Sequence, residues 1–580
     1  MNRKQRRASR KSPSPARAGG ASDPVRQLFA EAIAYQRQNR LDDAARAYKH
    51  LLAIAPDHAQ ANNDFACLLQ AQGKLREASA GFARALMLMP QLFDAFNGVC
   101  ATLVSVLPAL GEAMRRAAAA WPKQVPVNEL LNGDGVAAIA DDPLLLCILQ
   151  STPVREFTLE RVLTLLRGSL LADAVAGKPF DDTVLGFCCA LAQQCFINEY
   201  VFATTPDEEA QIDRLTSAIG DAVASGANIA PMQLAALAMY LPLHGPSYAN
   251  TLLARNWPAV IDDVVTQQLR EPLQERKLRE SIPRLATIDD DVSLRVRQHY
   301  EESPYPRWVH VAGNVAPTPI EQYLRDIFPT TPFAPLSQSD VLDVLVAGSG
   351  TGWQVIGVTQ KFAGARVFAV DLSLSSLAFA ARKTPATLAP RIAYAQADIL
   401  NLGAVDRTFD LIEASGVLHH MADPFAGWRI LLALLKPGGL MHVGLYSELA
   451  RREVVAVRSF IAERGFGSTP AEIRRCRQAL IDSAMRGVAR FNDFFSTSEC
   501  RDLLFHVQEI RVSIPAIKDF IAQNGLRFLG FEFDAESMRK YRALFAEKGW
   551  SLTDLGRWHA LEMEYPDTFA NMYQLWAQKS

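Results

Sequence analysis

Three glycines in five residues follow an apolar run in the segment VLVAGSGTGWQ, residues 344–354. Glycine weakens strands and helices alike, so Gly348, Gly350 and Gly352 indicate a turn in which bare backbone approaches a ligand closely. A dinucleotide-binding loop would follow the pattern GxGxxG and place its third glycine at position 353, which is Trp353. The spacing therefore argues against a pyrophosphate-binding loop.

Two carboxylates follow the glycines at the ends of later β-rich runs. The run ARVFAVD ends at Asp371, nineteen residues beyond Gly352, and the run AQADIL contains Asp398. A carboxylate at the end of a second strand suits the paired hydroxyls of a ribose. The run FDLIEAS then ends at Ser415, and a Pro-Gly-Gly turn leads into GLMHVGLY, which ends at Tyr446.

These residues belong to a part of the chain, from 291 to 580, in which short β-rich runs alternate with helical ones. The runs predicted as strands are 343–348, 365–371, 392–398, 409–415 and 439–446. Strands that alternate with helices predict an α/β fold with a mostly parallel sheet covered on both faces. The ligand of such a sheet is expected at the carboxyl ends of its strands.

Residues from about 341 to 446 resemble the class I S-adenosylmethionine-dependent methyltransferases, motif for motif and in order. The resemblance implies a Rossmann-like fold and S-adenosylmethionine as the cofactor. It implies that the three glycines lie under the methionine and ribose of the cofactor and that Asp371 holds the ribose hydroxyls. It further implies that Asp398 with Ile399 meets the adenine, and that Ser415 lines the methionine end beside the transfer site.

One position departs from the family pattern. The family usually carries an acidic residue two positions before the first glycine, near the ammonium of the cofactor, and here that position is Val346. Asp343 lies three residues earlier and faces the opposite side of the strand by alternation. We expect another carboxylate or backbone carbonyls to meet the ammonium. Because the end of the strand should face the ligand cleft, we also expect Val346→Asp to be tolerated.

Candidate catalytic residues follow the fourth and fifth predicted strands. Methyl transfer from a sulfonium is an in-line displacement that depends on positioning, and a nitrogen or oxygen acceptor can also need a base. His419 and His420 follow the fourth strand and Tyr446 ends the fifth, so all three are candidates. A turn in which the two histidines only cap structure is the alternative, and the pattern favours it. Adjacent histidines chelate poorly and no ligand cluster accompanies them, so we expect no metal.

Candidate substrate residues lie outside the core pattern. Tyr305, Arg307 and Trp308 lie in a proline-fixed segment before the domain, which fits a lid over the substrate pocket as well as a plain linker. His506 and Glu509 are three positions apart, one turn if that segment is helical. The segments QHYEESPYPRW, FFSTSECRDLLFHVQE and WHALEMEYPDTFANMYQLW are similar to segments of bacterial proteins that join tetratricopeptide repeats to a methyltransferase domain.

Residues 25–120 contain an internal repeat with an offset of 34 residues. Ala44 recurs as Ala78 and Tyr48 recurs as Phe82, and each copy closes on a proline, Pro56 and then Pro90. The period resembles the tetratricopeptide repeat, in which small residues let two helices cross closely and aromatic residues fill the space between repeats. The resemblance implies binding of a protein partner or peptide. An unrelated helical bundle is the alternative.

The remaining segments restrict the class of protein. Residues 121–290 have helical spacing and predict an all-helical region without assignable chemistry, and residues 1–24 predict a basic disordered tail. A net charge of −2 argues against a nucleic-acid-coating protein. The eight cysteines form no CxxC pair, which favours reduced thiols over a zinc site. No signal sequence or spanning segment is predicted, so we expect a cytoplasmic protein.

The hypothesis that these patterns favour is a methyltransferase that acts on a protein or partner-bound substrate recruited by the repeats. One alternative is a small-molecule methyltransferase whose repeats serve assembly. Another is a repeat scaffold with a degenerate methyltransferase domain, which Val346 favours and the intact glycines, Asp371 and Asp398 oppose.

Overall fold

The computed structural model of the chain describes residues 24–89, 96–120, 123, 125–133, 135–310, 316–336, 339–483 and 485–580. The basic tail predicted over 1–24 lies outside these residues except for Pro24, and so does Trp121 at the predicted start of the all-helical region. The chain divides into two compact units, Met1–Leu88 and Met89–Ser580. No helix among the described residues combines the length and the apolar character that crossing a bilayer requires.

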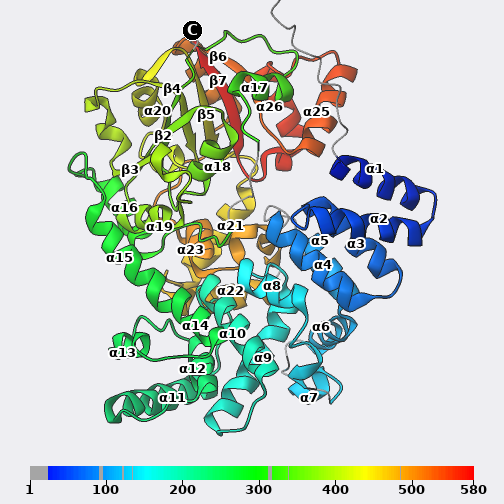
Figure 1. Ribbon diagram of the computed structural model, residues 1–580. Coiled ribbons are helices and arrows are strands. Elements are labelled where there is room, and N and C mark those ends of the chain that lie inside the picture. Colours follow the sequence, from blue (N-terminus) through cyan, green and yellow to red (C-terminus); the bar gives the residue numbers. More distant parts are fainter. Residues whose placement is uncertain are drawn as a thin grey trace, which may run out of the picture. The chain divides into compact units, whose positions relative to one another are not determined.

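The first unit consists of α1 (Pro24–Arg37), α2 (Leu41–Ile54), α3 (Ala59–Ala71) and α4 (Leu75–Leu88). Helix α1 packs against α2, and α3 packs against α4 (Figure 1). The buried small residues Ala44 and Ala78 allow this close approach, and the Tyr48 ring fills the core. Helices α2 and α4 begin at Leu41 and Leu75, which reproduces the 34-residue offset. The interpretation as tetratricopeptide repeats stays a prediction.

The second unit begins with a helical region, in agreement with the helical character predicted for the chain before residue 291. Its helices are α5 (Phe96–Val106), α6 (Pro108–Ala120), α7 (Val127–Leu130), α8 (Pro143–Ser151), α9 (Phe157–Val175), α10 (Asp182–Ile197), α11 (Pro206–Ser225), α12 (Pro231–Ala238), α13 (Ala249–Leu253), α14 (Ala259–Val265) and α15 (Glu271–Ser281). The first two helices, α5 and α6, fall within the range 25–120 predicted as repeats. Leucine and alanine side chains on α8, α9, α10 and α12 form its buried interior.

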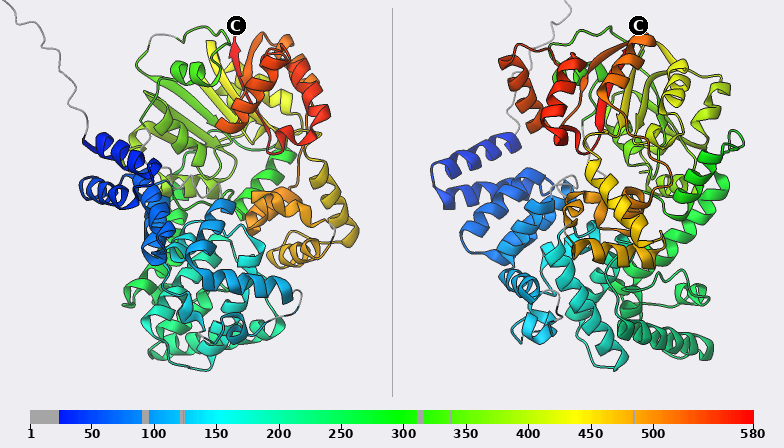
Figure 2. Two further views of the ribbon diagram at one scale, coloured as in Figure 1. Left: turned by 90° about the vertical axis from the view of Figure 1, so that its right-hand side faces the viewer. Right: turned by 180° about the vertical axis from the view of Figure 1, so that it is seen from behind.

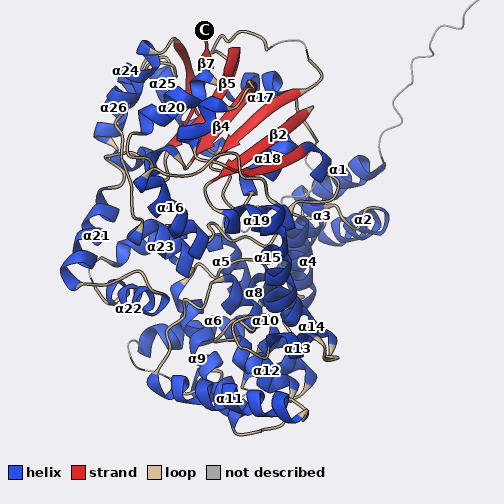
Figure 3. Cartoon of the chain, turned by 90° about the vertical axis from the view of Figure 1, so that its left-hand side faces the viewer, coloured by secondary structure: helices blue, strands red, loops and turns tan. Residues whose placement is uncertain are grey.

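A seven-stranded sheet follows, with the order β3-β2-β1-β4-β5-β7-β6 (Figure 3). Its strands are β1 (Leu342–Ala347), β2 (Ala365–Asp371), β3 (Ile392–Gln396), β4 (Phe409–Ser415), β5 (Leu435–Leu445), β6 (Leu526–Phe531) and β7 (Tyr573–Lys579). Strands β1 to β5 pair in parallel, and β7 runs antiparallel between β5 and β6. The predicted α/β fold with a mostly parallel sheet is therefore confirmed.

Helices pack against both faces of this sheet. They include α17 (Ile320–Ile327), α18 (Trp353–Lys361), α19 (Leu374–Lys383), α20 (Pro424–Ala433), α24 (Ile514–Gln523), α25 (Ala535–Glu547) and α26 (Leu555–Glu564). Helix α16 (Asp291–Glu302) packs against α19. One face buries Leu324 of α17 and Val355 of α18. The other face buries Trp428 of α20 and Phe520 of α24, whose rings stack with centroids 4.3 Å apart.

A helical insertion separates β5 from β6. It contains α21 (Arg452–Arg464), α22 (Pro470–Ile481) and α23 (Thr497–Phe505), which share a core of their own. Figure 2 shows these helices, in gold and orange, as a group apart from the sheet. The buried Arg477 of α22 forms two hydrogen bonds of 2.8 Å to Glu160 of α9. This ion pair ties the insertion to the helical region.

Strand β1 is buried on both faces, which overturns one expectation from the sequence. Val344 and Val346 belong to the core on one face, whereas Leu345 and Ala347 belong to the core on the other. Val346 is 0% exposed. The expectation that its side chain faces the ligand cleft is wrong, because helices cover both faces and the chain reaches the ligand edge only at Gly348.

This burial predicts that Val346→Asp destabilises the domain. Val346 lies opposite Glu413 of β4 in the parallel register, so the new carboxylate would be buried without a partner and beside a second acid. We expect a loss on the order of several kcal/mol in the free energy of unfolding, measured by chemical denaturation. Val341→Asp, at a half-buried position just before the strand, is the matched control. An unchanged denaturation midpoint for Val346→Asp would contradict the placement.

Candidate active site

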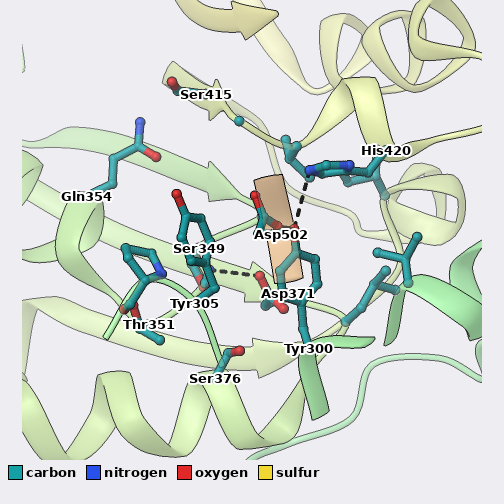
Figure 4. Close-up of a pocket in the computed structure, with 18 of the residues that line it drawn as sticks. Tyr300, Tyr305, Ser349, Thr351, Gln354, Asp371, Ser376, Ser415, His420 and Asp502 are labelled. Atoms are coloured by element: carbon teal, nitrogen blue, oxygen red, sulfur yellow. Dashed lines mark hydrogen bonds between the residues drawn. The ribbon is translucent and has the colours of Figure 1, made fainter. Parts of the chain in front are cut away.

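A cavity of about 230 Å³ lies at the carboxyl ends of the central strands (Figure 4). Its lining comes from the glycine loop after β1, from residues at or just beyond the ends of β2, β3, β4 and β5, and from the segment 293–306. Asp502 and Met572 complete it. The strand order reverses between β1 and β4, and open α/β sheets bind ligands at such a reversal. The cavity therefore occupies the position at which the sequence predicts a ligand.

The structure brings most of the sequence-predicted site residues to this cavity. Those that line it are Gly348, Gly350, Asp371, Asp398, Ile399, Ser415, His420, Tyr446 and Tyr305. Those that do not line it are Gly352, His419, Arg307, Trp308, His506 and Glu509.

Two glycines of the loop leave no room for a side chain. Gly348 has a φ of 72°, and a Cβ there would lie 2.4 Å from the side chain of Val417. Gly352 has a φ of 84°, and a Cβ there would lie 2.6 Å from the Cβ of Ala380 in α19. Both distances are far below the ~3.5–4.0 Å at which carbon atoms pack. Gly348 thus lets the loop border the cavity, and Gly352 lets it pack on α19.

The Asp371 carboxylate joins the end of β2 to the glycine loop. One oxygen, Oδ2, accepts the Gly350 N–H at 2.8 Å, and the other, Oδ1, accepts the Ser373 N–H at 2.9 Å. Burial raises the pKa of Asp371 to about 6, partly opposed by these hydrogen bonds and supported by the nearby charge of Glu301. Each carboxylate oxygen retains a further lone pair, so the group can still accept from two hydroxyls in the cavity.

Asp398 presents an unused acceptor to the same cavity. Its Oδ1 accepts the Leu400 N–H at 2.9 Å. Its Oδ2 is buried and has no hydrogen-bond partner among the described residues, although buried acceptors are nearly always paired. With the apolar Ile399 beside it, this oxygen fits the amino edge of an adenine. The residues present therefore fit the cofactor that the sequence motifs imply.

His420 offers an unprotonated nitrogen to the cavity. Its Nδ1 lies 2.9 Å from the backbone oxygen of Gln508, and a carbonyl only accepts, so Nδ1 carries the proton and Nε2 a lone pair. The Tyr300 hydroxyl lies 3.3 Å from Nε2 and donates to Asp502 at 2.6 Å. Burial lowers the pKa of His420, with an opposing effect of Asp502. The ring is therefore neutral at physiological pH.

Tyr300 and Asp502 were missed by the sequence-based assignment. Both line the cavity, and the hydrogen bond between them joins α16 to α23 across 202 positions of the chain. They lie inside the two segments, QHYEESPYPRW and FFSTSECRDLLFHVQE, whose resemblance was noted above. The resemblance of these segments to other proteins indicated that they matter. It did not indicate which of their side chains would line the cavity.

The remaining candidate residues support the cavity or lie outside it. His419 is fully buried, with its ring centroid 4.0 Å from that of Tyr446. Tyr446 lines the cavity, and the Arg451 guanidinium covers its ring at 3.8 Å. Tyr305 also lines the cavity and donates from its hydroxyl to Asp493 at 2.9 Å.

Arg307 and Trp308 border a second cavity, of about 220 Å³. The Trp308 indole donates to the backbone oxygen of Thr351 at 3.1 Å, which fastens this segment to the glycine loop. Arg307 pairs with Glu199 of the helical region at 3.1 Å. The segment 305–308 thus connects the glycine loop to the helical region. It also borders both cavities.

His506 and Glu509 follow the end of α23 and do not lie on a helix. The His506 ring stacks on His420, with centroids 3.7 Å apart. Glu509 forms buried ion pairs with Arg451 at 2.6 Å and Arg458 at 2.9 Å, and these arginines hold its pKa below the usual value despite burial. His506 therefore contacts the cavity residue His420 directly. Glu509 acts through Arg451, which covers the ring of Tyr446.

One group of described residues has ligand atoms close enough for a metal ion. His299, Asp502 and His506 have such atoms within 4.8 Å of one another. However, Nδ1 of His506 accepts the Gln508 N–H at 3.0 Å, so Nε2 carries the proton of the neutral ring. This tautomer does not suit a ligand, and the absence of a metal stays a prediction.

Comparisons with known proteins identify the central segment. Residues 344–439 match the family model described as a methyltransferase domain. An uncharacterized protein from Synechococcus sp. is 30% identical over 207 residues, which are 32% of this chain and 48% of that protein. Phosphoethanolamine N-methyltransferase 2 of Caenorhabditis elegans is 22% identical over 183 residues, covering 30% of this chain and 40% of the relative. The chain thus spans less than half the length of these relatives.

Part of the chain is also similar to a solved structure. PKMT2 from Rickettsia typhi in complex with AdoHcy is 14% identical, with a TM-score of 0.33, and the match covers 44% of this chain and 51% of that one. The family match lies on β1 to β5 and includes the glycine loop, Asp371 and Asp398. The chain therefore contains a methyltransferase domain.

Proposed function

We propose that this protein transfers a methyl group from S-adenosylmethionine to a nitrogen or oxygen atom, with His420 as the base. The observation that carries the proposal is a single cavity lined by three features. These are the Asp371 carboxylate fastened to the glycine loop, the unpaired Oδ2 of Asp398, and the unprotonated Nε2 of His420. The first two suit the cofactor, and the third suits an acceptor that must lose a proton.

When bound, the cofactor supplies an electrophilic methyl group. Asp371 accepts from its ribose hydroxyls and Asp398 from its adenine. The Tyr300 and Tyr305 side chains border the cavity and limit access of water to it. Nε2 of His420 takes the proton of the acceptor, while the Nδ1–H bond to Gln508 holds the ring in orientation. Asp502 fixes the Tyr300 hydroxyl beside that nitrogen.

The acceptor that we favour is a protein, or a molecule carried by one, recruited through tetratricopeptide repeats formed by α1 to α4. The 34-residue offset and the small buried residues Ala44 and Ala78 support this part of the proposal. A small-molecule acceptor is the alternative, and the relatives named phosphoethanolamine N-methyltransferase and demethylmenaquinone methyltransferase favour it. The repeats would then serve assembly.

Incubation of the full-length protein with tritiated S-adenosylmethionine and a cell lysate separates these readings. Counts in the protein fraction support recruitment of a protein acceptor, and counts in the small-molecule fraction support the alternative. Counts in neither fraction, together with no binding of S-adenosylhomocysteine in calorimetry, would leave a non-catalytic scaffold. The same incubation with Asp371→Asn provides the background.

Replacing Asp371 by asparagine should weaken binding of S-adenosylhomocysteine about 10- to 100-fold, because hydrogen bonds to a charged group contribute about 1.5–3 kcal/mol. Calorimetry measures the dissociation constant, and circular dichroism checks the fold. Asp343→Asn is the matched control, because Asp343 lies near the amino end of β1 and pairs with Arg407 and Lys436.

The same carboxylate predicts a pH dependence. The ionised form accepts from the ribose hydroxyls, so the affinity should be full about one unit or more above the Asp371 pKa of about 6 and fall as the pH drops through it. Asp371→Asn should remove this slope between pH 5 and 8. A wild-type affinity independent of pH over that range would remove Asp371 from the cofactor site.

Replacing His420 by glutamine should lower kcat about 10²- to 10⁴-fold, the usual contribution of general base catalysis, and leave the affinity for S-adenosylhomocysteine unchanged. In the wild type, kcat should fall only below the ordinary histidine range, because burial lowers the pKa of His420. His559→Gln, on α26 away from the cavity, is the control. A full rate in His420→Gln would mean that the ring only caps structure.

A further inference from the structure

We infer that the side-chain oxygen of Gln354 receives the ammonium of the cofactor, and that the buried pair Glu413–His442 holds this amide in place. The inference rests on the proposed function. It concerns the group that meets the ammonium of the cofactor, since Val346 stands where related domains carry an acid. Because Val346 is buried in the core, the acid that related domains carry at this position has no counterpart facing the cavity. A different group must stabilise the positive charge.

Gln354 lies in the first turn of α18 and lines the cavity. Its Nε2 donates to Oε2 of Glu413 at 2.9 Å. A carboxylate oxygen only accepts, so the amide nitrogen must face Glu413 and the amide oxygen must occupy the other branch. In Figure 4, Gln354 lies on the opposite side of the cavity from His420, and its amide oxygen is turned inward toward the other labelled residues. The methionine end of the cofactor is expected on the Ser415 side.

Glu413 stands beside the position of the missing acid. It lies on β4 opposite Val346 of β1, so both side chains point to the same face of the sheet. Glu413 is buried, and its Oε2 also accepts from Nδ1 of His442 at 2.7 Å. The acid that related domains carry on β1 is thus replaced by an acid on the neighbouring strand β4. Glu413 acts on the cavity through its hydrogen bond to the amide of Gln354.

Glu413 is held in this orientation by a network of buried polar side chains on the face of the sheet that α18 covers. The network consists of Glu413, His442, Glu532, Trp576 and Lys361. Glu413 and Glu532 raise the pKa of His442 even though burial alone would lower it. The His442 ring stacks on Trp576, with centroids 4.6 Å apart. The Trp576 indole donates to Glu532 at 2.6 Å, and Lys361 lies 3.9 Å from the same carboxylate. The charges of Glu413 and Glu532 are therefore balanced by His442 and Lys361 in the interior.

Other acceptors near the cavity have partners that fit different roles. The Ser415 hydroxyl is bound to the side chain of Gln574 at 2.9 Å, and Asp371 is bound to the glycine loop. Asp502 is the carboxylate that could compete for the ammonium, but it accepts from Tyr300 at the His420 side. Among these side-chain acceptors, the amide oxygen of Gln354 is the one whose orientation is fixed by a hydrogen bond at the other end of its own group.

The test compares two ligands by calorimetry on the full-length protein: S-adenosylhomocysteine, and its deamino analogue, which keeps the carboxylate and lacks the ammonium. Gln354→Met, which is nearly isosteric, should weaken binding of S-adenosylhomocysteine about 10- to 100-fold and leave that of the analogue unchanged. Gln360→Met, on the same helix and away from the cavity, is the matched control. Thermal melting without ligand confirms that each variant folds.

Glu413→Gln tests the positioning role, because Gln354 itself is intact in that variant. It should reduce the preference for S-adenosylhomocysteine over the analogue, whereas a merely structural change would weaken both ligands equally. Equal losses for the two ligands in Gln354→Met, or no loss, would overturn the inference. So would loss of the preference in Asp502→Asn alone. Absence of binding by the wild type would overturn the proposed function as well, and the wild-type titration reveals this before any variant is made.

Discussion

Burial of the sheet on both faces is the constraint on which the rest of the structure depends. Strand β1 contributes Val344 and Val346 to one core and Leu345 and Ala347 to the other, so neither face is free for a ligand. Ligand chemistry is restricted to the carboxyl edge, where the glycine loop and Asp371 meet. There the Asp371 carboxylate satisfies the Gly350 and Ser373 backbone amides and still retains acceptor capacity.

The charged network under the sheet is the exception to this apolar interior. Buried charges are tolerated only when they are paired and hydrogen-bonded, and Glu413, His442 and Glu532 meet that condition through one another and through Trp576. Such a network contributes little net stability, and we infer that it serves to orient the amide of Gln354. The network is connected to the cavity at the carboxyl edge of the sheet by the hydrogen bond between Glu413 and Gln354.

Local patterns were enough to predict the five parallel strands, the glycine loop and Asp371, because each depends on a run of neighbouring residues. Strands β6 and β7 were not predicted, since β7 inserts antiparallel between β5 and β6, far from β5 in sequence. The orientation of Val346 was predicted wrongly because alternation gives relative faces and not which of them helices cover. The contact between Tyr300 and Asp502 spans 202 positions and leaves no local trace.

The side of the cavity near His420, where we propose that the acceptor binds, depends on parts of the chain outside the matched domain. Asp502 lies on α23, whose first turn is fastened to the helical region: Thr497 and Ser498 bond to Glu199, and Glu499 pairs with Arg155. The buried pair of Arg477 with Glu160 fastens α22 in the same way. The cofactor half, in contrast, is built mainly from the matched segment itself. The helical region therefore helps to set the position of Asp502, and through Asp502 that of Tyr300 beside His420. None of its described residues lines the cavity itself.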